Sequence, residues 1–219
     1  MKVQWTSNDY GRSGILAIAE DGDTQPPIET FYVDYLIETV DQDRLAIAAA
    51  LVFGPYVESR LVFENPVSSG VARAIENLYP NKAVRVEPVS YSENHSPHGD
   101  SVLHVNSHFR DPNFVNRVGQ QRQVNVSFQP TDRSSGGLLT MDSLDVACNS
   151  WLHAELRPDA QGDVFCTLAG GVLLSTDLSA AGMAICDSSA DEAQLVYSGV
   201  SRLLESVGLS LVLRDCGAH

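Results

Sequence analysis

The chain has 219 residues, of which 43% are hydrophobic, 19% charged and 7% aromatic. This composition excludes a collagen, a coiled coil, a disordered chain and a disulfide-rich miniprotein. A chain of this length buries about 70–75% of the surface that it exposes when unfolded. The formal net charge is −14, from 28 acidic and 14 basic residues. Because an anionic protein repels phosphate backbones and anionic lipid surfaces, we expect neither a nucleic acid nor a membrane as its partner.

The first part of the chain predicts several strands and then one helix. Segments rich in β-branched, aromatic or alternating apolar residues predict strands at 14–19, 31–40, 45–53, 57–63 and 84–91. The Ala-rich segment 45–53 would also suit a buried helix, because a short apolar run carries no distinguishing period. Asn65 as a cap and Pro66 at the first helical position predict a helix over 66–79 with one apolar stripe.

The middle of the chain, residues 92–121, has a different composition. It is rich in Ser, Asn, His, Pro and Gln, and only 101–107 has the pattern of a strand. A polar segment of this length is typical of a linker or of a long functional loop. We therefore predict that it separates two strand-rich halves.

This middle segment also holds four of the six histidines, together with two aspartates, one of them Asp111. Imidazole nitrogens and carboxylate oxygens are ligands of divalent transition metals. The candidate metal ligands are His95, His98, Asp100, His104 and His108. Their spacing matches no established metal motif, so the alternative is a solvated polar loop that binds no metal.

The last part of the chain again predicts strands, at 122–128, 182–186 and 209–213, with a short apolar pair at 138–139. Segment 163–175 predicts a hairpin that turns at Gly170-Gly171. Segment 143–156 fits either a helix stripe or a strand, so its structure stays open at this point.

The clearest predicted helix of the chain is 190–207. Ser189 and Glu192 have the spacing of a capping box, in which each side chain accepts a hydrogen bond from the backbone N–H of the other residue. Apolar residues then follow at helical spacing, and Gly208 suits the position just after a helix.

The two halves resemble each other in the order of their predicted elements. The helices give the best local match, since 69–76 and 198–205 share Ser, Gly, Val, Arg and Glu in register. The competing explanation is that any two helix-to-strand passages share periodicity. The prediction is an α+β fold with mostly antiparallel sheets and two pseudo-repeated halves, 1–91 and 122–219, each of several strands followed by one main helix and a final strand.

Motifs for catalysis or nucleotide binding are absent from the sequence. The four cysteines are widely spaced and form no CxxC pair, which is typical of buried or inert thiols in a reducing compartment. Cys148 has a histidine, His153, five residues away. We expect a core thiol beside a surface imidazole there, rather than a nucleophile and its base.

These observations predict a binding or interaction module whose protein or small-molecule ligand lies at the junction of the two halves. The alternative is a metal-dependent enzyme, of a hydrolytic kind, that uses the His95–His108 cluster; no other cofactor and no catalytic residue is assigned. The start of the chain lacks the apolar run of a signal peptide, and its longest apolar stretch is too short to span a bilayer, so we expect a cytoplasmic protein. Segments 3–6 and 209–213 are candidate edge strands that a second subunit would complete in a homo-oligomer.

Overall fold

The computed structural model describes every residue except 9, 93–98, 107–120, 160, 188–193 and 216–219. Within the described residues, five α-helices, one short 3-10 helix and 11 strands form a mixed α+β structure. The strands are β1 (Lys2–Ser7), β2 (Ser13–Ile18), β3 (Thr30–Val33), β4 (Arg60–Ser68), β5 (Arg85–Ser90), β6 (Ser101–Asn106), β7 (Arg122–Pro130), β8 (Gly137–Leu139), β9 (Ser143–Cys148), β10 (Ala180–Asp187) and β11 (Ser210–Asp215). The helices are α1 (Gln42–Phe53), the 3-10 turn η1 (Gly54–Tyr56), α2 (Ser69–Leu78), α3 (Ser150–Leu156), α4 (Gly162–Leu174) and α5 (Gln194–Glu205).

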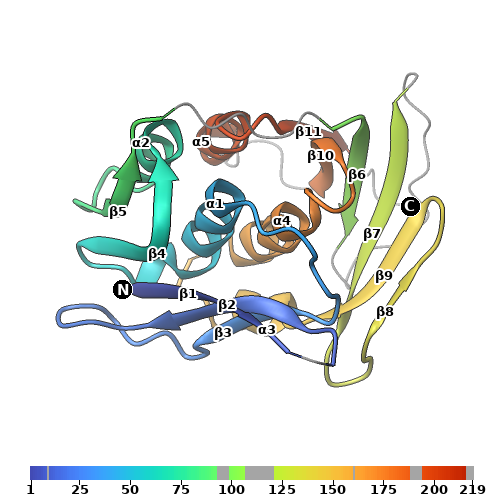
Figure 1. The fold of residues 1–219 in the computed structure, drawn as a ribbon, viewed down its shortest axis with the longest axis horizontal. Helices are drawn as coiled ribbons and strands as arrows, with labels where there is room; N and C mark the ends of the chain where they lie inside the picture. The colour runs from blue at the N-terminus through green and yellow to red at the C-terminus, as the bar shows by residue number, and fades with distance from the viewer. Residues whose placement is uncertain (9, 93–98, 107–120, 160, 188–193, 216–219) are drawn as a thin grey trace.

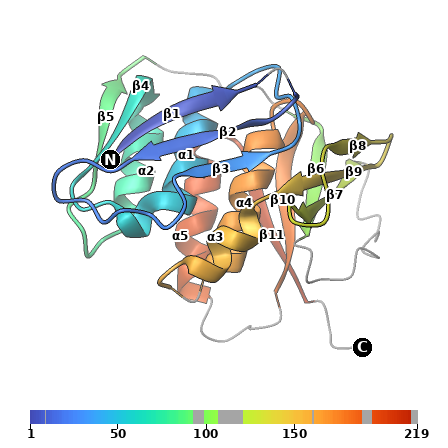
Figure 2. The same cartoon turned by 90° about the horizontal axis from the view of Figure 1, so that it is seen from below.

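The strands follow one path, β11-β10-β6-β7-β9-β3-β2-β1-β4-β5, with β8 beside β9. Figure 1 shows that this path curves around α1 and α4, which lie together in the centre, while α2 and α5 lie above them. The two halves of the path meet at β3 and β9, where Val33 pairs with Cys148 and the Asp34 N–H donates to Ala147 O at 2.8 Å. Figure 2 shows α3 next to this joint and to α4.

The prediction of mostly antiparallel sheets is wrong. Antiparallel pairing joins β1 to β2, β2 to β3, β3 to β9 and β8 to β9, but the other neighbouring strands run parallel. Parallel neighbours need a crossover connection, which α2 supplies between β4 and β5 and α5 supplies between β10 and β11. Two other helices stand where the sequence predicts strands.

Those two helices are α1 and α4, which replace the predicted strand 45–53 and the predicted hairpin 163–175. All side chains of 45–53 and of 165–174 are buried. A helix that is buried on every side has no polar face, so its sequence shows no 3.6-residue alternation and reads as a plain apolar run. Local chemistry still starts α1, because the Asp41 carboxylate accepts the Arg44 N–H at 3.0 Å.

Gly170 and Gly171 permit close packing rather than a hairpin turn. A Cβ atom on Gly170 would lie 2.5 Å from Cζ of Phe128 in β7, and one on Gly171 would lie 2.9 Å from Cγ2 of Val105 in β6. Because these two glycines have no Cβ atom, α4 can approach the sheet closely.

Two arginines connect the ends of α1 and α4. Arg44, in the first turn of α1, donates from Nη1 to the Ser175 and Thr176 hydroxyls at the end of α4, at 2.9 and 3.2 Å. Arg157, which precedes α4, donates to the carbonyls of Leu51 and Val52 at the end of α1. The two helices are therefore antiparallel, and each carbonyl end lies near a cation, as the helix dipole favours.

The two predicted amphipathic helices exist, with shifted bounds. The first helix begins at Ser69 rather than at residue 66, because the Ser68 hydroxyl accepts the Val71 N–H at 3.4 Å and Pro66 remains in β4. The second is α5, and Gly208 after it has the positive φ of 72° that its predicted position requires. The capping box at residues 189–192 lies outside the described residues. Segment 143–156, for which the sequence fits either a helix or a strand, contains both β9 and α3.

Strand order in the two halves corresponds, but strand direction does not. Outward from the joint, the order is β3-β2-β1-β4-β5 on one side and β9-β7-β6-β10-β11 on the other. The pairs β1–β2 and β2–β3 are antiparallel, whereas β6–β7 and β7–β9 are parallel. The repeat therefore stays a prediction.

Candidate functional site

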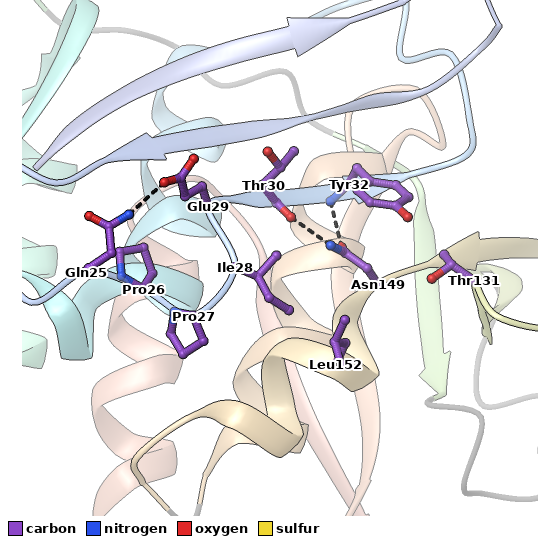
Figure 3. A pocket seen from close by; sticks show the side chains of 10 residues that line it. All are labelled: Gln25, Pro26, Pro27, Ile28, Glu29, Thr30, Tyr32, Thr131, Asn149 and Leu152. Carbon is purple, nitrogen blue, oxygen red and sulfur yellow. Dashed lines mark hydrogen bonds between the residues drawn. The ribbon is translucent and has the colours of Figure 1, made fainter.

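A groove lies at the joint between β3 and β9, where the two halves of the sheet meet (Figure 3). Its volume is about 590 Å³, which is within the range of small-molecule and peptide sites. The groove is lined by Gln25, Pro26, Pro27, Ile28, Glu29, Thr30, Tyr32, Thr131, Asn149 and Leu152. The first seven belong to the loop before β3 and to β3 itself, and the last three come from the second half of the chain.

Asn149, which follows β9, holds one side of the groove to the edge of β3. Its side-chain Oδ1 accepts the Tyr32 N–H at 2.8 Å, and its Nδ2 donates to Thr30 O at 2.7 Å. Its own backbone N–H donates to Tyr32 O at 3.3 Å. Only 3% of Asn149 is exposed. The buried amide therefore satisfies the edge of β3 in the way that a neighbouring strand would.

His153 in α3 lies behind this contact and also bonds to Thr30 O, at 3.1 Å from Nε2. Because a carbonyl only accepts, Nε2 carries the proton. Burial is the main cause that lowers the pKa of His153 to about 4, and the Arg157 cation lowers it further. The prediction of a surface imidazole is wrong, because only 6% of His153 is exposed and its ring packs 5.5 Å from the rings of Phe31 and Phe53.

The neighbouring thiol agrees with the prediction of a core cysteine. Cys148 is buried, and burial raises its pKa to about 12. Cys166 in α4 is also buried, and burial raises its pKa to about 12 as well. Since the thiolate is the reactive form, neither thiol is an activated nucleophile.

The open side of the groove combines an apolar wall with one carboxylate. Pro26, Ile28 and Leu152 supply apolar surface (Figure 3). Glu29 is the charged residue among those that line the groove, and its Oε1 accepts from Gln25 Nε2 at 2.7 Å. This lining suits a ligand with an apolar group and a cationic or hydrogen-bonding group.

Three of the five predicted metal ligands lie outside the described residues, and the other two do not line the groove. His95, His98 and His108 fall in the ranges that the structure does not describe. Asp100 is exposed, and its N–H donates to Ser179 O at 2.9 Å. His104 in β6 is 3% exposed and hydrogen-bonds to Gln123 Oε1. Over the part of the chain that is described, no group of three or more His, Cys, Asp or Glu residues is placed to hold a metal ion.

Sequence reasoning placed a ligand at the junction of the halves but found none of the residues of the groove. Tyr32 and Asn149 are 117 positions apart, so no local spacing connects them. The signals that the sequence offered were the run Gln25-Pro26-Pro27 and an Asn within segment 143–156, which fits either a helix or a strand. Neither signal distinguishes a binding groove from an ordinary loop.

None of the helices within the described ranges has the length and apolarity that crossing a bilayer requires. A scan against models of protein families gives no match, and searches of curated proteins and of solved structures give no similar chain.

Proposed function

We propose that this chain is a binding or interaction module, and that its protein or small-molecule ligand occupies the groove between its two halves. The observation that carries the proposal is the lining of the groove, which comes from residues 25–32 on one side and from Thr131, Asn149 and Leu152 on the other. Binding sites favour such junctions because two structural units supply walls that neither has alone.

The chemistry of the groove supports binding. Its walls offer amides, hydroxyls, apolar side chains and one carboxylate. His153 donates a hydrogen bond from Nε2 to Thr30 O behind the wall, which makes it a support of the groove rather than a base facing a substrate. Asn149 fixes the two halves of the wall to each other, so the groove is formed before any ligand arrives.

The proposal includes a repeated origin of the two halves. The matching order of strands from the joint outward supports it, as does the contact between α2 and α5, where Gly199 lies against Leu78. Under this proposal, the groove is the seam between the two copies.

Substitution of Leu152 by Arg tests the groove directly. We expect that some members of a small-molecule and peptide fragment library shift the NMR signals of the Thr30, Tyr32 and Asn149 amides in the unmodified chain. Leu152→Arg places a long cation in the groove and abolishes these shifts.

Leu156→Arg is the matched control. It adds the same charge to the same helix, at a side chain that is 47% exposed and outside the lining of the groove, and it leaves the shifts unchanged. A library in which no member shifts these amides, or in which Leu152→Arg leaves the shifts intact, contradicts the proposal.

A further inference from the structure

The outer edge of β3 determines what kind of ligand the groove can take. On its inner edge, β3 pairs with β2 in an antiparallel ladder, which Glu29 extends because its carbonyl accepts the Ala17 N–H at 2.8 Å. In such a ladder, the backbone groups of successive residues point alternately to the two edges. The N–H and C=O groups of Thr30 and Tyr32 therefore point to the groove, and the bond from the Tyr32 N–H to Asn149 agrees with this assignment. Ile28 precedes β3 and lines the same groove.

Part of this edge has no partner. Asn149 accepts the Tyr32 N–H, and both Asn149 and His153 donate to the Thr30 carbonyl. Among the described residues, no hydrogen bond pairs the Thr30 N–H, and none pairs the N–H or C=O of Ile28. Both residues line the groove and are partly exposed. An unpaired strand edge of this kind is a template for an added strand.

The edge is short and bounded at both ends. Asn149 occupies the end at Tyr32, and Pro26 and Pro27 have no N–H to donate at the other end. Backbone pairing alone therefore provides few hydrogen bonds, and side chains must supply the rest of the affinity. Leu152 and Ile28 offer an apolar contact, and Glu29 favours a cation, as does the net charge of −14.

We propose, on the basis of the function proposed above, that the ligand is an extended peptide segment of a partner protein. The segment adds as a short strand to β3, accepts from the Thr30 N–H and exchanges hydrogen bonds with Ile28. It carries an apolar side chain against Leu152 and a Lys or Arg side chain toward Glu29.

A library of short random peptides displayed on phage and selected on the full chain provides the probe. The selected peptides are expected to combine an apolar residue with Lys or Arg. Binding of a selected peptide, made synthetically, slows hydrogen exchange of the Thr30 N–H at least tenfold, because that group passes from water to a backbone acceptor. This measurement uses the unmodified chain, so it does not depend on the folding of a variant.

Ile28→Pro and Ile28→Val form the matched pair of variants. Proline removes the N–H of residue 28 and is expected to weaken binding of the selected peptide at least tenfold, whereas valine keeps the N–H and weakens it no more than threefold. Glu29→Gln is expected to weaken binding severalfold at low salt and less at high salt.

The outcomes separate this inference from the function proposed above. A peptide that Leu152→Arg displaces but that leaves exchange at Thr30 unchanged, or that binds Ile28→Pro as well as Ile28→Val, overturns strand addition and leaves the groove as a binding site. Strand addition is also overturned if small molecules bind the groove but the phage selection yields no peptide whose binding Leu152→Arg abolishes. When neither class of probe reaches the groove, both proposals fail.

Discussion

His153 is a neutral imidazole that packs against the rings of Phe31 and Phe53, and its Nε2–H donates to the Thr30 carbonyl. The sequence predicted the burial of Cys148 correctly because free cysteine is among the most buried residue types. It could not predict the burial of His153, because that depends on rings contributed by β3 and α1. At the scale of single residues, composition predicts an environment only where the residue type has a strong preference of its own.

The depressed pKa of His153 makes stability depend on pH. Its folded-state pKa of about 4 lies below the ordinary value of 6.5, so between these values the unfolded chain binds a proton that the native chain does not. Stability therefore falls as the pH drops through this window, by about 3 kcal/mol in total for this group. We expect His153→Gln, whose amide still donates to Thr30 but does not titrate, to lose correspondingly less stability between pH 7 and pH 4.5. Urea unfolding of both proteins at both pH values measures the difference, and profiles that run parallel contradict this account.

At the scale of elements, the sequence predicted the amphipathic helices α2 and α5, left α3 open between a helix and a strand, and missed the buried helices α1 and α4. The apolar stripes of α2 and α5 predicted them, although the cap at Ser68 and the continuation of β4 moved the start of α2. The buried helices α1 and α4 have no stripe, and short apolar runs fit strands equally well. Only the tertiary packing of these two helices against each other distinguishes the alternatives.

Two glycine substitutions test this difference between the helices. Gly170→Ala in α4 places a Cβ 2.5 Å from the buried ring of Phe128, and we expect a loss of about 1–3 kcal/mol in the free energy of unfolding. Gly70→Ala in α2 meets no atom within 4 Å, and we expect a gain of about 0.5–1 kcal/mol because alanine loses less backbone entropy in a helix. Thermal or urea unfolding compares the two variants, and equal effects at both sites are inconsistent with the packing of α4.

At the scale of the whole molecule, the strands lie along one sheet path and share one core. Arg44 and Arg157 connect the ends of α1 and α4, and the sheet encloses both helices. The sequence predicted the junction as the place for a ligand, yet the residues of the groove come together only through the β3–β9 joint. Such long-range pairing has no signature in local spacing.

This shared core predicts cooperative unfolding. Trp5 lies in β1 and Trp151 in α3, so the fluorescence of the variants Trp5→Phe and Trp151→Phe reports on one half each. We expect each variant to show the same urea midpoint by its remaining tryptophan as by far-ultraviolet circular dichroism, because neither half keeps its core without the other. If the two tryptophans report different midpoints after correction for each substitution, the halves unfold as separate units.

The antiparallel pairing of α1 and α4 also affects how the protein is made. During synthesis, α1 leaves the ribosome long before α4, since residues 54–161 must be translated between them. Until then, the face of α1 that packs on α4 stays uncovered, and the nascent chain exposes apolar surface there. Correct folding of the first half therefore waits for the translation of the second.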